Sequence, residues 1–317
     1  MVSPPDRPPS APDAAETNAL PGILCMSGGA LALSVNDMAV KSLSGTYALH
    51  QVILIRSLIG IAFVVFVILV SGTGLRQLVT VRPGAHLVRV SFIVLSNLTF
   101  YLGLSVLPLA DGVAIAFISP LLVTALSALV LGERVPPRLW LTLFVGLLGV
   151  VVMVRPGAGV IRPGALLVAL SAASYACAHL MTRRMKTTES ATTLAFYGQL
   201  GFVVVSTAFG VIVGDGHLAQ ATGGPLDFLF RPWLWPPAQD WPAFLATGVA
   251  VAAAGILLAQ AYRLCRVAVV APFEYVAMPM AIFWGVVVFG RWPSPWAWLG
   301  IALICGAGLL ALYERRS

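Results

Sequence analysis

The stretch VVAPFEYVAMPMAIFWGVVVF, residues 269–289, places Glu274 and two prolines inside an otherwise apolar run. Crossing the hydrocarbon core of a bilayer takes about 20 apolar residues, so a run of this length can span it. A carboxylate inside a span costs on the order of 3 kcal/mol on insertion, and such groups mark pathways or paired sites. Pro272 and Pro279 leave the carbonyls of residues 268 and 275 without their helical donors, which bends a helix. The stretch therefore predicts a kinked membrane helix with a functional glutamate.

The rest of the chain is similarly apolar. Of its 317 residues, 59% are hydrophobic and 10% are charged, and the mean hydropathy is +0.94. A water-soluble domain of this size could not bury so much apolar surface, so the solvent is a bilayer. We expect an all-α integral membrane protein. Ten spanning helices are predicted at 21–42, 49–71, 87–107, 110–131, 137–154, 164–182, 192–213, 242–262, 267–289 and 295–313.

Lysine and arginine are distributed unevenly between the two sides of these spans. With a cytoplasmic N-terminus, thirteen of them, Arg89 included, lie on the cytoplasmic side, five lie outside, and Arg56 lies within a span. Basic loops stay in the cytoplasm. We therefore expect both termini in the cytoplasm of a multi-pass protein of the bacterial inner membrane, with the 214–241 loop outside. The net charge of +7 then reflects the basic residues that orient the chain in the membrane.

Several classes of function lack their sequence patterns. Basic patches interleaved with aromatic residues are missing, so we expect no nucleic-acid partner. The four cysteines show no CxxC spacing, and we expect no metal and no cofactor. Motifs for ATP hydrolysis or for zinc or serine hydrolases do not occur, so we expect no enzyme, and any transport must use gradients. Residues 1–20 are rich in proline and alanine, which favours a disordered cytoplasmic tail over a signal peptide.

The chain contains an internal repeat. LVLGERVPPRLWL at 129–141 aligns with VVFGRWPSPWAWL at 287–299, which pairs glycine, proline and tryptophan residues at one offset. Pro120 and Pro279 are paired in the same way, and Arg56 aligns with Gln199. Each repeat, 21–155 and 163–313, holds five predicted helices. Because five is odd, the second repeat enters the membrane inverted, as in secondary transporters, whose substrate site lies near the membrane midplane between the repeats.

Two segments carry a family resemblance. LADGVAIAFISPLLVTALSALVLGERVPPRLWLTLFVGLLGVVVMVRPG at 109–157 resembles the end of the first half-repeat of the drug/metabolite transporter superfamily, EamA family, and APFEYVAMPMAIFWGVVVFGRWP at 271–293 resembles the second. The resemblance spans about residues 21–313. It implies a secondary transporter for a small organic metabolite: an amino acid, a cofactor such as riboflavin or S-adenosylmethionine, a drug or a metallophore. One departure is Arg291, where related chains often carry an acid that matches Glu133.

Charged residues within the spans are the first candidates for a transport site. Asp37 and Arg56 lie about 8 and 10 Å from the outer surface, at 1.5 Å per helical residue, and can meet at one depth. They form either a salt bridge that neutralises two buried charges or a gate or substrate anchor. Glu274 lies about 10 Å from the inner surface, near the depth of His179. It is either a solvated carboxylate on a polar path or half of an ion pair with His179.

Other polar residues complete the predicted substrate and coupling site. They are Asn36, Asn97, Tyr101, Ser119, Tyr175, Tyr197, Gln199, Gln260, Tyr262 and Tyr275. The expected partners are a small-molecule substrate and membrane lipid, with coupling to protons as an option. Two alternatives remain open: a membrane-embedded enzyme that uses an intramembrane carboxylate as general base, and a membrane scaffold that transports nothing.

Overall fold

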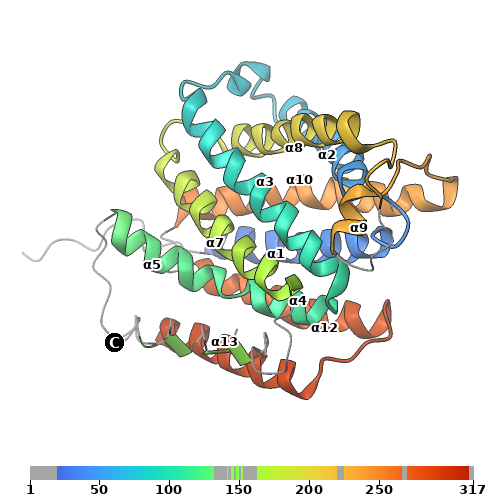
Figure 1. Cartoon of the computed structure of the whole chain (residues 1–317). Coiled ribbons are helices and arrows are strands. Elements are labelled where there is room, and N and C mark those ends of the chain that lie inside the picture. Colours follow the sequence, from blue (N-terminus) through green and yellow to red (C-terminus); the bar gives the residue numbers. More distant parts are fainter. Residues whose placement is uncertain are drawn as a thin grey trace, which may run out of the picture.

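The computed structural model describes residues 20–131, 163–219, 225–265 and 270–313, together with residues 141, 144–145, 148–149 and 151–152 (Figure 1). Helices and turns make up the described residues, and no strand occurs among them. The α-helices are α1 (Leu20–Leu43), α2 (Leu49–Val70), α3 (Pro83–Val106), α4 (Leu109–Ala116), α5 (Ser119–Leu131), α7 (Pro163–Arg184), α8 (Ala191–Val213), α9 (Pro225–Phe230), α10 (Trp241–Leu264), α12 (Ala277–Val287) and α13 (Pro295–Tyr313). Three 3-10 helices are η1 (Leu75–Leu78), η2 (Ala238–Asp240) and η3 (Ala271–Val276).

The expected all-helical membrane architecture is confirmed. Within the described residues, seven helical segments are long and apolar enough to cross a membrane. Their apolar side chains also face outward: Val70, Val204 and Val211 are 72%, 61% and 83% exposed. Exposure of such apolar side chains to water is unfavourable, whereas contact with lipid tails is favourable. The predicted helix 137–154 and the predicted tail lie almost entirely outside the described residues.

The third span begins four residues earlier than predicted, at Pro83. Proline suits the first turn of a helix, where its missing N–H is not needed. Arg89, which we counted on the cytoplasmic side, lies in the second turn of α3 and is only 5% exposed. Its guanidinium donates to the Thr182 hydroxyl over 2.7 Å and to the Leu194 carbonyl over 2.9 Å. These two partners, on α7 and α8, satisfy the charge of Arg89 inside the bundle.

Two close helix pairs form the centre of the bundle. The most extensive contacts join α1 to α10 and α3 to α7. Gly103 of α3 faces Gly164 of α7 so closely that a Cβ on Gly103 would lie 2.5 Å from the Gly164 carbonyl oxygen. Small residues allow helix backbones to approach in this way inside a membrane. Figure 1 shows α2 and α8 on one side of this centre and α12 and α13 on the other.

The helix ends gather at two ends of the bundle. At the first, called the Lys41 end, Lys41 in the last turn of α1 donates to the carbonyls of Leu104 and Leu107, over 2.6 and 2.7 Å. There α1 and α3 end, and α2, α4 and α7 begin. At the opposite end, called the Glu189 end, Glu189 accepts from Thr80 over 2.6 Å and lies 3.4 Å from His86. The connection between α7 and α8 is thus tied to the start of α3 and to the segment before it.

A loop closes over part of the Lys41 end. The Tyr47 hydroxyl donates to Asp240 over 2.5 Å, and Arg231 donates to the Ser44 carbonyl over 2.8 Å. Burial and the neighbouring Asp240 carboxylate raise the pKa of Tyr47 to about 12, so the phenol keeps the proton that it donates. The turn between α1 and α2 is therefore pinned to the segment that leads into α10.

Candidate functional site

Two of the predicted spans are broken, and both breaks lie at the centre of the site. Segment 110–131 divides at the turn Phe117–Ile118 into α4 and α5, with Pro120 as the second residue of α5. In segment 267–289, the 3-10 helix η3 occupies Ala271–Val276, and α12 starts at Ala277. Of the two prolines expected to bend this span, Pro272 lies within η3 and Pro279 is the third residue of α12. Broken membrane helices leave backbone groups unpaired, and they are tolerated where they line a cavity.

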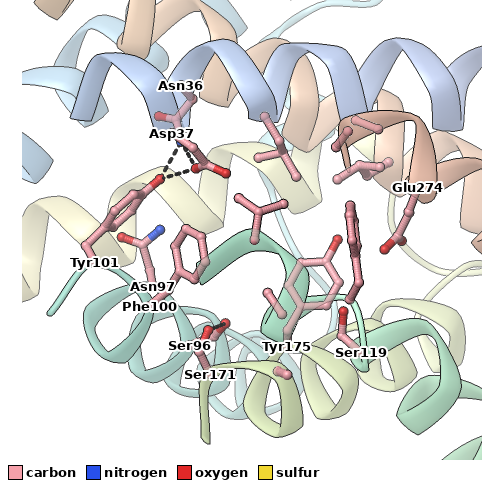
Figure 2. A pocket seen from close by; sticks show the side chains of 18 of the residues that line it. Asn36, Asp37, Ser96, Asn97, Phe100, Tyr101, Ser119, Ser171, Tyr175 and Glu274 are labelled. Carbon is pink, nitrogen blue, oxygen red and sulfur yellow. Dashed lines mark hydrogen bonds between the residues drawn. The ribbon is translucent and has the colours of Figure 1, made fainter. Parts of the chain in front are cut away.

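A cavity of about 150 Å³ lies between these breaks and helices α1, α3, α7 and α10. Because one water needs roughly 10–15 Å³ by this measure, the cavity holds about ten waters or part of a small solute. Asp37 and Glu274 enter from opposite sides (Figure 2). The polar wall consists of Asn36, Asp37, Ser96, Asn97, Tyr101, Ser119, Ser171, Tyr175 and Glu274, and Phe100 and Phe117 contribute aromatic surface.

Asp37 belongs to a hydrogen-bonded network. The Tyr101 hydroxyl donates to Asp37 Oδ1 over 2.7 Å, and Asn36 Nδ2 donates to the same oxygen over 3.1 Å. Asn36 also donates to the Tyr101 oxygen over 2.5 Å and accepts from the Thr247 hydroxyl over 2.5 Å. A carboxylate that accepts two hydrogen bonds is fixed in orientation, so Asp37 presents a positioned negative charge to the cavity.

Arg56 lies behind this network and is fully buried. Its guanidinium donates to Asn36 Oδ1 over 3.1 Å and to Asn97 Oδ1 over 2.7 Å. The guanidinium carbon also lies 5.3 Å from the Tyr101 ring centroid and 5.2 Å from that of Phe202, within range for cation–π contacts. Between the described residues Asp37 and Arg56 the structure has no direct ion pair, and Asn36 and Tyr101 connect the two charges.

Glu274 forms a second polar centre on the other side of the cavity. The carboxylate is 7% exposed and accepts a hydrogen bond from the Tyr262 hydroxyl. His179 does not pair with it: the imidazole packs against the rings of Tyr175 and Tyr262, with centroids 4.0 and 4.7 Å away. The His179–Glu274 ion pair considered above is therefore absent from this part of the structure. A buried carboxylate without a counter-charge is energetically costly, which a proton or a cationic group would relieve.

The predicted site residues fall into three groups. Asn36, Asp37, Asn97, Tyr101, Ser119, Tyr175 and Glu274 line the cavity. Arg56, His179 and Tyr262 contact that lining from behind. Tyr197, Gln199 and Gln260 lie elsewhere: Tyr197 donates to the Leu78 carbonyl, Gln199 lies against Gly60, and Gln260 accepts from Arg263. The side chain of Tyr275 is outside what the structure describes.

Some lining residues were not predicted. Ser96 and Ser171 face each other across α3 and α7 at 3.1 Å, and Thr247 supports Asn36. Single hydroxyl residues in a membrane helix commonly bond their own backbone, so the sequence offers no signal that Ser96 and Ser171 line the cavity or that Thr247 bonds to Asn36. Among the described residues no group of three or more His, Cys, Asp or Glu side chains gathers at a metal-binding distance.

An all-helical membrane bundle with broken helices around a cavity that carries two carboxylates is typical of a solute transporter. Residues 20–155 match the model of the EamA-like transporter family. A riboflavin transporter of Rhizobium johnstonii is 29% identical over 80% of this chain and 78% of its own length. An S-adenosylmethionine uptake transporter of Rickettsia prowazekii is 22% identical over 89% of both chains. Over residues 20–155 the chain is thus similar to the EamA-like transporter family.

A solved crystal structure has the same fold. It superposes with a TM-score of 0.67 over 96% of this chain and 99% of its own, at 22% identity. At that identity the likeness concerns the arrangement of helices alone.

Proposed function

We propose that this transporter carries a small organic metabolite across the membrane by alternating access, with the cavity between Asp37 and Glu274 as its binding site. The observation that carries the proposal is the central cavity itself, which has a carboxylate on each side and broken helices in its wall. Carriers bind their substrates at such breaks because freed backbone groups and intramembrane charges meet there. The energy for transport comes from solute or ion gradients.

The architecture proposed is two inverted five-helix repeats, 21–155 and 163–313. Its support is a reciprocal packing pattern: α1, the first helix of one repeat, packs along α10, the third of the other, while α3 packs along α7. α1 ends at the Lys41 end, whereas its counterpart α7 begins there. The two broken spans are also counterparts. Rocking of such repeats against each other would open the cavity alternately to each side.

The orientation proposed places both termini in the cytoplasm. The Lys41 end is then the outer end and the Glu189 end is the inner one, in keeping with the excess of lysine and arginine in the inner loops. Exposed aromatic residues at the outer end, Trp235 at 87% and Trp292 at 70%, suit the headgroup layer.

The roles proposed for the two polar centres differ. Asp37, held by Asn36 and Tyr101, anchors the substrate, while Arg56 keeps this network in place. Glu274 accepts a hydrogen bond from the Tyr262 hydroxyl, and no cation lies beside it among the described residues. It therefore exchanges a proton or holds a cationic substrate group during the cycle. Phe100, Phe117 and Tyr175 offer ring faces to a planar substrate. Riboflavin and S-adenosylmethionine, the solutes named for the relatives, both carry a flat ring system.

Purified protein in proteoliposomes tests the proposal. Liposomes loaded with unlabelled riboflavin or S-adenosylmethionine are placed in labelled solute, and uptake by exchange is followed against protein-free liposomes. Exchange of the unchanged compound supports transport. Conversion of a loaded compound or of lipid into a new product, without exchange, would instead favour the enzyme with an intramembrane base. If neither solute exchanges, metabolite profiles of cells with and without the protein identify the next compounds to test.

A further inference from the structure

A second cavity, of about 390 Å³, lies at the Lys41 end. The last turns of α1 and α3, the start of α4 and the segment after α12 form its wall. We call it the Lys41–Arg291 cavity after the two charged residues that line it; both are basic, and its lining includes no acid. Like charges that share a cavity repel each other, and an anion between them would remove that repulsion.

The donors of this cavity are only partly used. Lys41 has three N–H donors, and the carbonyls of Leu104 and Leu107 accept from two of them. Arg291 is exposed, and within the described residues its guanidinium has no hydrogen-bond or ion-pair partner. Its planar fork of N–H groups matches the two oxygens of a carboxylate or a phosphate.

The start of α4 adds to the positive field. Pro108, Leu109 and Ala110 line the cavity, and Pro108 is the N-cap residue with no side chain to cap the helix. The first N–H groups of a helix have no acceptor within it and favour a negative charge nearby. The next residue, Asp111, is buried and does not form part of the wall.

This cavity lies directly in line with the central one. On α1, Lys41 is four residues beyond Asp37, and on α3, Ser105 is four residues beyond Tyr101, a step of about 6 Å along each helix. On α3, Leu104 lies between these two levels in the sequence and is buried. A solute on its way between the Lys41 end and the central cavity would cross this step.

We propose that the Lys41–Arg291 cavity is an oxyanion-binding vestibule, which holds the carboxylate or phosphate of a ligand against Lys41, Arg291 and the start of α4. Two sources can supply this group: a soluble solute or the headgroup of an anionic phospholipid. The first case, a transported solute, rests on the function proposed above. Such a solute carries an anionic group, and this group leaves the vestibule when the rest of the solute reaches Asp37 and Glu274.

Binding to the purified full chain tests the site without any need for transport. Succinate is the soluble probe, measured by saturation-transfer NMR in neutral detergent at constant ionic strength, because salt screens exposed charges. Phosphatidylglycerol is the lipid probe, measured as retained adducts by native mass spectrometry. The variant is Arg291→Gln, and the control is Arg76→Gln, which removes an equally exposed arginine from η1 at the opposite end. Unfolding temperatures of both variants verify that they are folded.

We expect Arg291→Gln to weaken succinate binding about ten-fold or more, as loss of a charge-assisted contact implies, and Arg76→Gln to leave it unchanged. Loss of phosphatidylglycerol adducts alone, again only in Arg291→Gln, would support the vestibule and make a lipid headgroup its ligand. Binding that is equal in all three proteins, or absent in both assays, would overturn the proposal. That result would leave the transport proposal untouched, since exchange in proteoliposomes is measured independently.

Discussion

The network between Asp37 and Arg56 makes a prediction about coupling. Arg56→Gln removes the bonds to Asn36 and Asn97, each on the order of 1.5 kcal/mol or more because one partner is charged. We therefore expect a loss of about 3 kcal/mol in the free energy of unfolding. Asp37→Asn keeps an oxygen that can accept from Tyr101 and Asn36, so its expected cost is about 1 kcal/mol.

The two changes should not be additive. Asn36 and Tyr101 bond to both charged residues, so once one charge is gone they can reorient, and removing the other costs less. For residues that share partners in this way we expect the double variant to recover about 1–2 kcal/mol of the summed loss.

Unfolding in mixed dodecyl maltoside–SDS micelles, followed by circular dichroism, gives these free energies. The matched control pairs Arg56→Gln with Glu189→Gln, a buried acid at the other end of the bundle whose bonds are to Thr80 and His86. The losses in the free energy of unfolding caused by that pair of changes should add within about 0.5 kcal/mol. Equal additivity for Asp37 and Arg56 would refute the network, because it would mean that the two charges share no partner in the membrane.

Glu274→Gln keeps the shape and the ability to accept a hydrogen bond, so we expect normal membrane expression with loss of gradient-driven accumulation; wild-type accumulation and unchanged pH dependence in proteoliposomes would make this residue structural. Gly103→Ala should strongly reduce folded protein in detergent, as judged by size-exclusion chromatography, because its Cβ meets the backbone of Gly164, while Gly84→Ala, with open space around it, should have no such effect. Leu218 is 42% exposed, so in a background that lacks Cys25, Cys177, Cys265 and Cys305 the variant Leu218→Cys should react with an impermeant maleimide in intact spheroplasts. Protection in spheroplasts together with labelling in inverted vesicles would show the opposite orientation.

The sequence predicts the helices well because membrane spans have a strong signal of their own. About 20 apolar residues between polar turns suffice to place a span, and Pro272, which was expected to disturb its helix, lies within the 3-10 helix η3. The exception is the start of α3, which was placed four residues too late because His86 looks like a loop residue; Arg89, inside the predicted span, is also buried. Their partners Glu189, Thr182 and Leu194 lie about a hundred residues away, and no local pattern reports them.

The candidate site was predicted in part, and the misses have a common cause. Depth in the membrane follows from residue number, so Asp37 and Arg56 were correctly placed at one level, but the side of a helix that faces the cavity depends on packing. Tyr197 and Gln260 are polar and within spans, yet they bond near the Glu189 end. Thr247 has no distinguishing sequence feature and still supports Asn36.

Release of solutes from proteoliposomes tests the central claim most directly, because it does not require the substrate to be known. Liposomes that contain the wild-type protein or Glu274→Gln, or no protein, are loaded with a small-molecule extract of bacterial cells, and the solutes that leave are measured by mass spectrometry under an imposed pH gradient. The account predicts that at least one solute leaves wild-type liposomes, unchanged in mass, faster than it leaves either of the other two. Release from wild-type liposomes that matches protein-free liposomes for every solute would contradict it.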